Sequence, residues 1–366
     1  MTDQTRISDR LRALTSRSLS RRQFVGYSAA TAASVAASRF APSAAAQDDN
    51  TLVVGYFGGT YGDNWQKAVI EPAQEALGIK IVSDNGFTEW YSKVKLNPDN
   101  PPIDVFTLQE VDAYRAQQDG ILAELDTSGM TNFNNLFDLA KEGAPYRFTI
   151  GWTRLGLVIN TDKVTTPPTS FADYWKEPLV SMRLGMPGMP NTFCLDFLVK
   201  IAELNGGGID NLDPGFEAVK KLNLAYAAPD FTQAYQDLCA GNLDAMLWVD
   251  DQAESWIDKG CAMQYINPSE GAIANLVTLV TAKGSKKQEM AAKFIDFALG
   301  VDPQAQFAET QYVGPTNKEV VLDEAVAARC LYGEDQVKSL THYDPAALLP
   351  IFDQVTERWK SEIATG

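Results

Sequence analysis

The segment TLVVGYFGGTYGDNW, residues Thr51 to Trp65, decides the fold. Its first six residues include several β-branched side chains and predict a strand, and the glycines between Gly58 and Gly62 predict a turn. Asp63 or Asn64 is then expected to cap the N-terminus of a helix that reaches about Leu77. A strand, a glycine turn and a helix in this order indicate an α/β protein.

The alternation of strands and helices continues beyond this segment. Gly78 is expected to end the first helix. The elements expected next are strands at Ile79–Val82 and Asp104–Thr107 and helices at Trp90–Leu96 and Glu110–Gln118. Strands that alternate with helices in this way imply a parallel sheet covered by helices.

A second α/β series follows a long extended segment, Tyr146 to Asn160, and a second sheet is expected between about Ser181 and Ile266. The strand Leu276–Thr281 then precedes a helical C-terminal region that can return to the first sheet. We therefore expect two lobes joined by more than one crossover, with a binding cleft between them. The other expected elements are strands at Ser181–Gly185 and Leu243–Val249 and helices at Ser170–Trp175, Thr192–Asn205, Pro214–Ala225, Phe231–Cys239, Gln252–Lys259, Lys286–Leu299, Pro303–Glu309, Asp323–Ala328 and Ala346–Ile363.

The composition is that of a soluble protein long enough for two domains, with 366 residues, 45% hydrophobic and 21% charged side chains. No apolar run approaches the roughly 20 residues that a membrane-spanning helix needs. The formal net charge is −16, from 31 basic and 47 acidic residues. This charge argues against a nucleic-acid partner and weakly favours a cationic ligand.

The first 46 residues differ in charge from the rest, with seven Arg, no Lys and two Asp. Ser20-Arg-Arg-Gln-Phe-Val25 matches the twin-arginine pattern, and Ala44-Ala-Ala46 offers a cleavage site. We expect residues 1–46 to be a twin-arginine signal peptide that is cleaved after Ala46; the alternative is a disordered basic tail. Cleavage would remove the seven Arg and two Asp of the signal peptide and change the net charge from −16 to −21. We expect the mature protein to be periplasmic and not to insert in the membrane.

The four cysteines, Cys194, Cys239, Cys261 and Cys330, show no CxxC spacing. Disulfides are permitted in the oxidising compartment predicted above. Cys239 and Cys261 each precede an expected strand, Leu243–Val249 and Ala262–Ile266, so their sulfurs can meet if these strands are neighbours. The alternative is that both are buried free thiols.

No motif in the sequence indicates an enzyme. The only histidine, His342, has no Ser or Cys nucleophile in a recognisable setting, and the GxSxG, HExxH, Walker and GxGxxG motifs are absent. Asp250 and Asp251 could do acid/base work, but acids in the first turn of a helix are also explained as dipole partners and solvated charge. We expect no catalytic residues, cofactors or metal, with a secreted hydrolase or lyase as the alternative.

The glycine turn after the first strand has two interpretations. Its backbone N–H groups at a helix start could bind a phosphate or phosphonate. Asp63 lies at the same helix start and would repel an anion. We therefore favour a turn that mainly presents Tyr61 and Trp65.

Several short motifs, in a shared order, resemble a known family. They are Trp90–Lys95, Asp104–Thr107, Ile150-Gly-Trp152, Thr169–Lys176, Gly241–Trp248 and Glu309–Asn317. Over nearly the whole mature chain they are similar to type II periplasmic solute-binding proteins of ABC importers, particularly the spermidine/putrescine-binding group. Gly241-Asn-Leu-Asp-Ala-Met-Leu-Trp248 is the most informative, because this strand ends in an aromatic residue at the cleft in that family.

The resemblance implies a two-lobed α/β fold, the type II periplasmic-binding-protein-like fold, in which each lobe is a mainly parallel sheet flanked by helices and a hinge lies between. Lobe 1 is expected at 47–157 plus about 281–317 and lobe 2 at 158–280, with C-terminal helices at 318–366 packing on both. The implied mechanism is closure of two lobes on a small solute and delivery to a membrane permease. A monomer is expected.

A ligand drives closure only through contacts from both lobes, so candidate residues are taken from each. Aromatic faces can hold an alkylammonium by cation–π attraction and a carboxylate can pair with its charge. The alternative for the tryptophans is that they pack in the core. The candidates are Tyr61, Trp65, Gln109, Trp152, Arg154, Asn191, Trp248, Asp250, Asp251 and Asn275.

Two departures from the polyamine pattern bear on the ligand. Met186–Asn191 and Ala274–Val277 stand where that group has acidic or aromatic anchors. Arg154, together with Asp251, could instead bracket a zwitterion, or Arg154 could form a structural ion pair. We predict an amine-bearing solute, polyamine-like as spermidine or putrescine, with a small zwitterion, carboxylate or phosphonate as the alternative. Ferric binding is not expected, because no suitable His or paired Tyr ligands are present.

Overall fold

The computed structural model describes residues 49–87, 89–229 and 231–363. The predicted signal peptide and its cleavage site after Ala46 lie outside these residues. Within them, no helix is both long and apolar enough to cross a membrane.

The first α/β series forms the parallel strands β1 (Thr51–Phe57), β2 (Lys80–Gly86) and β3 (Val105–Gln109). β1 lies in the middle and pairs with both of the others. All its residues are buried, which explains why its sequence is an apolar run rather than an alternation. The predicted parallel arrangement of this series is confirmed.

The helix after β1 begins earlier than the sequence indicates. α3 (Gly59–Trp65) continues through one π-helical turn, Gln66–Ile70, into α4 (Glu71–Leu77). The predicted caps Asp63 and Asn64 are wrong, because Gly59 has a φ of 67° and so allows the chain to turn into the helix at once. Gly78 ends the helix with a φ of 64°, as predicted.

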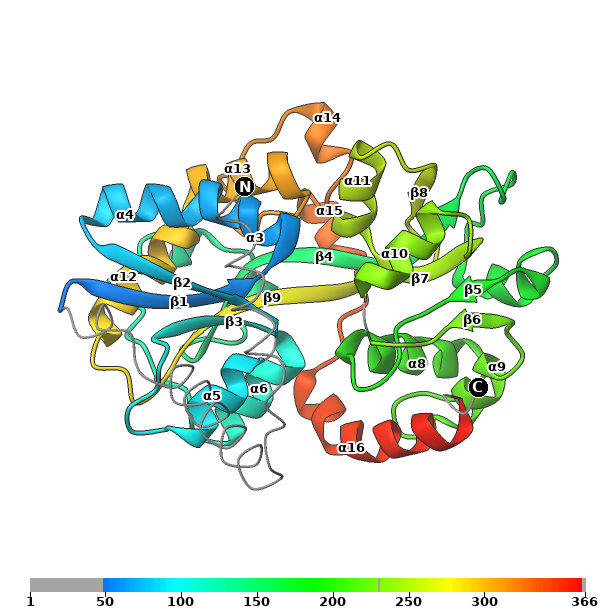
Figure 1. Cartoon of the computed structure of the whole chain (residues 1–366), viewed down its shortest axis with the longest axis horizontal. Helices are drawn as coiled ribbons and strands as arrows, with labels where there is room; N and C mark the ends of the chain where they lie inside the picture. Colours follow the sequence, from blue (N-terminus) through cyan, green and yellow to red (C-terminus); the bar gives the residue numbers. More distant parts are fainter. Residues whose placement is uncertain (1–48, 88, 230, 364–366) are drawn as a thin grey trace, which may run out of the picture. The chain divides into compact units, whose positions relative to one another are not determined.

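Helices cover both faces of this part of the sheet. Figure 1 shows α3, α4 and α13 (Val301–Gln311) on one side of the strands and α5 (Glu89–Leu96) and α6 (Glu110–Gln118) on the other. The predictions for α5 and α6 agree within one residue. Two short helices that were not predicted, Phe133–Asn135 and α7 (Asp138–Lys141), follow before the chain becomes extended.

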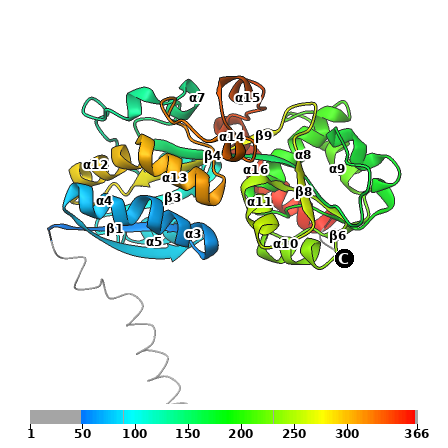
Figure 2. The ribbon, with the colours of Figure 1, turned by 90° about the horizontal axis from the view of Figure 1, so that it is seen from above.

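The extended segment is one strand of 14 residues, β4 (Arg147–Asn160), and all of it is buried. Its first part pairs antiparallel with β9 (Ile273–Thr281). Its second part lies between β7 (Ala245–Val249) and β8 (Met263–Ile266), both antiparallel to it. Figure 2 shows β4 and β9 passing from one α/β series to the other.

The strands form one hydrogen-bonded sheet in the order β2-β1-β3-β9-β4-β7-β5-β6, with β8 also on β4. The prediction of two separate sheets is therefore wrong in this detail. β9 pairs with β3, and β4 pairs with β7, so the crossovers themselves bridge the two series. Each series is parallel and ends in one antiparallel crossing strand.

The second series contains the short strands β5 (Leu184–Gly185) and β6 (Leu224–Tyr226). β5 lies between β6 and β7 and pairs parallel with both. β5 is shorter than predicted because a 3-10 turn occupies Leu179–Ser181. The helix predicted at Pro214–Ala225 ends at Val219, and β6 follows. The helices of this series are Phe171–Trp175 (a 3-10 helix), α8 (Thr192–Leu204), α9 (Asp213–Val219), α10 (Phe231–Cys239) and α11 (Asp250–Asp258).

The C-terminal helices pack on both series. α12 (Gln288–Ala298) and α13 lie on the first, and α16 (Pro345–Glu362) contacts both α6 and α8. Before α16, the backbone of Thr341 bonds to Ala272 and Ala274 at the start of β9, so a third chain passage runs beside the crossover. The remaining helices are α14 (Glu324–Ala327) and α15 (Glu334–Lys338), of which α15 was not predicted.

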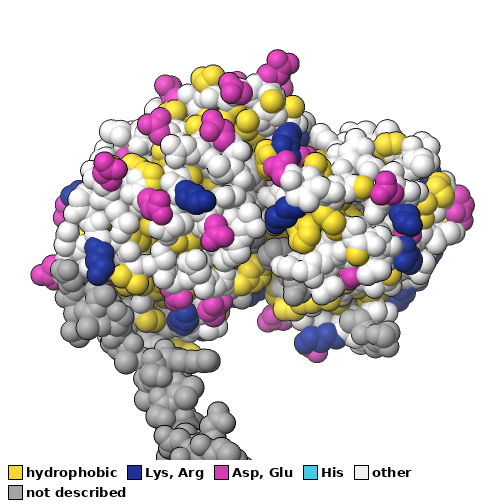
Figure 3. All heavy atoms as spheres, turned by 45° about the horizontal axis from the view of Figure 1, so that its top comes forward, with side chains coloured by type: hydrophobic (Ala, Val, Ile, Leu, Met, Phe, Trp, Pro, Cys, Tyr) yellow, Lys and Arg dark blue, Asp and Glu magenta, His cyan; other side chains and the backbone are white. Residues whose placement is uncertain are grey.

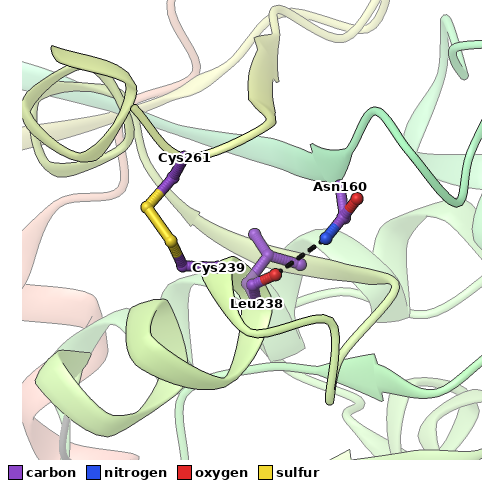
Figure 4. The surroundings of a disulfide bond; sticks show 4 residues. All are labelled: Asn160, Leu238, Cys239 and Cys261. Atoms are coloured by element: carbon purple, nitrogen blue, oxygen red, sulfur yellow. Dashed lines mark hydrogen bonds between the residues drawn. A yellow bond between two sulfur atoms is a disulfide. The ribbon is translucent and has the colours of Figure 1, made fainter. Parts of the chain in front are cut away.

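A disulfide joins Cys239 at the end of α10 to Cys261 before β8 (Figure 4). β7 and β8 are not direct neighbours, since β4 lies between them. Both run antiparallel to β4 and therefore begin at the same end of it, beside Asn160. The Nδ2 of Asn160 donates to the carbonyl of Leu238 at 2.9 Å and holds the end of α10 there. Cys194 and Cys330 are buried free thiols.

We predict that the double substitution Cys239→Ser and Cys261→Ser lowers the free energy of unfolding by about 2–4 kcal/mol, because the loop between them regains its freedom in the unfolded chain. Urea unfolding followed by Trp fluorescence measures this. Dithiothreitol should destabilise the wild type by a similar amount and leave the double variant unchanged. Equal stability of the two proteins without reductant would contradict the prediction.

Candidate functional site

Four helices begin at the carboxyl ends of parallel strands, near β4 and β9, the two strands that run from one series to the other. α3 follows β1, α6 follows β3 and α11 follows β7 almost without a loop. α8 follows β5 after the segment Met186–Asn191. Ligand sites of open α/β sheets lie outside the carboxyl ends of the strands. The side chains at these helix starts, and those of the crossing strands, form the candidate site.

Arg154 on β4 and Asp250 at the start of α11 form a buried ion pair. The Nε of Arg154 donates to Oδ2 of Asp250 at 2.6 Å, and the backbone N–H of Arg154 donates to Oδ1 at 2.9 Å. Arg154 Nη1 also donates to Oε1 of Gln336 at 3.3 Å. Burial raises the pKa of Asp250, and the Arg154 charge opposes this rise. The explanation of Asp250 as a solvated charge is thus wrong, because β4 supplies its counter-ion inside the protein.

Asp251 is also buried, but its partners are uncharged. Its Oδ2 accepts from Nε2 of Gln311, at the end of α13, at 3.3 Å and from Nε2 of Gln252 at 3.1 Å. Burial, and then the charge of Asp250, raise the pKa of Asp251 to about 7. The solvated-charge explanation is therefore wrong for this residue as well.

Tyr61 and Gln109 present polar atoms without a hydrogen-bond partner in the described part of the chain. These are the Tyr61 hydroxyl and the Gln109 Oε1, and both atoms are buried. The Tyr61 ring lies edge-on to Phe307, with the ring centres 5.0 Å apart. Burial, and next the charge of Asp251, raise the pKa of Tyr61. Tyr61 therefore belongs to the surroundings of Asp251, although the two come from different α/β series.

The three candidate tryptophans, Trp65, Trp152 and Trp248, have at most 1% of their surface exposed. Trp65 packs edge-on against Phe307, and Trp248 lies near the Tyr235 ring. The indole nitrogen of each has no hydrogen-bond partner among residues 49–363 that the structure describes. Their apolar faces are therefore engaged in packing, while their role toward a ligand stays a prediction.

The two candidate asparagines have partners within the fold. Asn191 caps α8, where its Oδ1 accepts from the backbone N–H of Phe193 at 2.9 Å. Asn275 on β9 donates to Oγ1 of Thr153 on β4 at 2.8 Å and so links the two crossing strands. α8 and α11 lie on opposite sides of the sheet (Figure 1), so Asn191 and the two aspartates approach the site from different sides.

Gln311 is the residue of this site that the sequence did not single out. It is fully buried, and its Oε1 accepts from Nδ2 of Asn64 on α3 at 2.9 Å while its amide nitrogen reaches Asp251 and Oγ of Ser255 on α11. One side chain thus connects α3, α11 and α13. The motif Glu309–Asn317, which resembles a loop beside the ligand, was the only signal that could have pointed to it.

A second group of titratable side chains lies where α6 meets α8 and the third chain passage. Nε2 of His342 is 2.8 Å from Oε2 of Glu110 at the start of α6. Asp196 on α8 faces both, and burial, then the Glu110 charge, raise its pKa to about 8 while His342 opposes this. The interaction with Glu110 outweighs burial and raises the pKa of His342. This position gives His342 an ionic partner.

No group of three His, Cys, Asp or Glu side chains that could hold a metal ion occurs in the described residues. On the face shown in Figure 3, acidic side chains are spread over the surface with basic ones among them rather than gathered in one patch. The net negative charge therefore does not by itself mark the site.

A family model for bacterial extracellular solute-binding proteins matches residues 100–338 of this chain. The spermidine/putrescine-binding periplasmic protein of Salmonella typhimurium is 25% identical over 283 residues, which cover 73% of this chain and 78% of the relative. A solved ABC transporter protein from Clostridium perfringens is 25% identical, with a TM-score of 0.73 and coverage of 85% of this chain and 99% of the other.

A further solved structure is the periplasmic binding protein AgtB of A. tumefacien R10 in complex with agropinic acid. It is 22% identical, covers 86% of this chain and 99% of its own, and has a TM-score of 0.70. This likeness shows the fold alone. Together with the structure, these neighbours confirm the predicted two-lobed α/β fold of periplasmic binding proteins. The residue boundaries predicted for the lobes stay a prediction.

We predict that Arg154→Met lowers the free energy of unfolding by about 3–5 kcal/mol, because it leaves the Asp250 charge buried without a counter-ion. The double variant with Asp250→Asn should recover part of this loss. Urea unfolding at pH 7 tests both. The matched control is Lys293→Met at the exposed Lys293–Glu289 pair, which should cost less than about 1 kcal/mol. A loss in Arg154→Met no larger than in this control would refute the prediction.

A second prediction concerns Asp196. Because its pKa is raised to about 8, the folded protein keeps a proton that the unfolded chain loses near pH 4. Stability from this proton is fully present below about pH 4 and is lost as the pH rises to about 8. Asp196→Asn should therefore make the fall in the urea midpoint between pH 5 and pH 8 less steep, whereas Asp353→Asn, at an exposed position of α16, should not. Parallel curves for Asp196→Asn and wild type would exclude a retained proton.

Proposed function

Because the chain belongs to the bacterial extracellular solute-binding protein family, we propose that it captures an amine-bearing small solute, polyamine-like as spermidine or putrescine. It is a substrate-binding component of an ABC transporter, and such proteins deliver a small molecule to a membrane permease. Its relatives are solute-binding proteins and not enzymes. We infer the amine class from the charges at the candidate site.

The observation that carries this proposal is a difference between two adjacent acids: Asp250 has an arginine as its ionic partner, and Asp251 has only uncharged partners among the described residues. Arg154 pairs with Asp250, so Asp251 is the carboxylate left for a cation. The Tyr61 hydroxyl lies buried near Asp251 without a partner among the described residues. An ammonium group would supply the missing positive charge and N–H donors.

The capture mechanism that we propose is closure of the two lobes about the crossing strands. β4, β9 and the passage at Thr341 connect the two series and are the segments that can act as the hinge. Tyr61 and Gln109 belong to the first series, and Asp251 to the second. A solute that contacts all three gains affinity only when the lobes are together, and this difference drives closure.

A carboxylate-bearing solute, zwitterion or phosphonate is the second candidate. AgtB, which shares the fold, is in complex with agropinic acid. An acid would need a free cation at the site, but Nε and Nη1 of Arg154 are engaged with Asp250 and Gln336. This engagement is why we place the amine first.

We also propose export through the twin-arginine pathway, cleavage after Ala46 and action as a monomer in the periplasm. The family is extracellular or periplasmic. The twin-arginine pattern at Arg21-Arg22 and the alanines before Gln47 support the route. Deletion of residues 1–46 should abolish export, as fractionation of cells would show.

A thermal-shift screen of the protein against polyamines, amino acids, organic acids and phosphonates tests the proposed function. A ligand at 100 times its dissociation constant should stabilise the folded state by about 2.7 kcal/mol. We expect amines to shift the melting temperature and acids to leave it unchanged. Trp248→Ala should lose the shift, while His342→Gln should keep it. A shift with acids only would overturn the amine assignment.

A further inference from the structure

Asp251 differs from its neighbour Asp250 in how its charge is balanced. It is 4% exposed, and the groups that donate to its Oδ2 are the amides of Gln311 and Gln252. An amide donates a hydrogen bond but brings no positive charge. Burying an ionised carboxylate without a cation is unfavourable, and a bound proton avoids this cost.

The elements packed around Asp251 bring no free cation to it in the residues that the structure describes. α3 brings the Tyr61 hydroxyl, α10 brings Tyr235, whose hydroxyl donates to the Val249 carbonyl, and α13 brings the Gln311 amide. Of the two arginines on β4, Arg154 is bound to Asp250 and Arg147 pairs with Glu110. Other titratable or charged groups in the described part of this region include Tyr265 on β8, Glu254 on α11 itself, and Arg329, which pairs with Glu254. Cys330 lies near Asp250, and Lys259 at the end of α11 donates to Oγ1 of Thr60 on α3.

We propose that the solute's ammonium group binds at Asp251 by replacing a proton on its carboxylate. This inference rests on the proposed function and specifies its ligand chemistry. The O–H bond of the carboxylic acid breaks, the proton passes to solvent and the ammonium takes its place beside the oxygen. The charge buried at the site is the same before and after capture.

The exchange makes Asp251 a specificity-determining residue. A solute with an N–H-bearing ammonium gains an ionised partner, whereas a carboxylate at this position meets an acid that repels it once ionised. Gln311 connects Asp251 on α11 with Asn64 on α3, because its side-chain amide hydrogen-bonds to both. The contact between Gln311 and Asp251 therefore depends on the two series being together.

The exchange also sets the direction of the pH dependence. Burial and the Asp250 charge hold the pKa of Asp251 at about 7, and an alkylammonium stays protonated up to about pH 10. The ionised form therefore makes up about one tenth of the protein at pH 6 and about nine tenths at pH 8. The dissociation constant for an amine should be about tenfold higher at pH 6 than at pH 8.

Isothermal titration of the full-length chain with putrescine, in phosphate and in Tris at the same pH, measures the protons released. We expect about half a proton per putrescine bound at pH 7 and close to one at pH 6. The tenfold change in the dissociation constant should accompany the release. Asp251→Asn should weaken putrescine binding at pH 8 by at least tenfold and abolish any pH dependence of what remains.

Glu309→Gln is the matched control, because Glu309 is an exposed acid two residues before Gln311. It should keep both the affinity and the proton release of the wild type. Binding of putrescine with no proton release and equal affinity at pH 6 and pH 8 would overturn the exchange and leave the proposed function intact. No binding of putrescine at either pH would overturn the amine class and, with it, this inference. A melting curve for each variant confirms that the fold is kept.

Discussion

Every residue of β4 is buried, and its backbone is shared among three other strands. Its first half belongs with β9 and its second half with β7 and β8, so one strand carries the sheet from the first series to the second. Because side chains alternate along a strand, fixing its register against β9 and β7 also fixes where Arg154 points. The position of Arg154 then determines which of the two aspartates at the start of α11 is neutralised.

At the start of α11, Arg154 can neutralise only one of the two aspartates, Asp250 and Asp251. Acids at a helix N-terminus are stabilised by the helix dipole, but this stabilisation is smaller than the cost of removing their charge from water. Arg154 reaches Asp250 with both its Nε and its backbone N–H, which leaves Asp251 to amide partners. The chain as a whole carries a charge of −16, yet this site holds only one unpaired acid. Net charge therefore says little about the ligand.

The sequence predicted the strands and helices well where the local pattern and the tertiary structure agree. β1, α6, α10 and the end of the first helix at Gly78 are examples. It failed where tertiary contacts override local preference: α3 starts at Gly59 rather than at Asp63, and β5 is cut to two residues by the turn before it. The single sheet was missed because hydrogen bonds between β4 and β9 depend on residues more than a hundred positions apart, which periodicity does not encode.

The sequence predicted only part of the candidate site, because the rest depends on contacts between elements that are distant in the chain. The resemblance of Gly241–Trp248 led to the start of α11, where Asp250 and Asp251 lie, but it did not reveal that Trp248 is wholly buried. Gln311 and the Glu110–His342–Asp196 group were missed because each joins elements that are distant in the chain; Gln311 lies in the motif Glu309–Asn317, but the motif does not show which of its residues reaches the site. Both groups contain a buried acid whose pKa is raised, on opposite sides of the sheet near the crossing strands. Groups of the first series act on both acids, Tyr61 and Gln311 on Asp251 and Glu110 on Asp196. The lobe closure proposed above would therefore be coupled to the protonation of these acids.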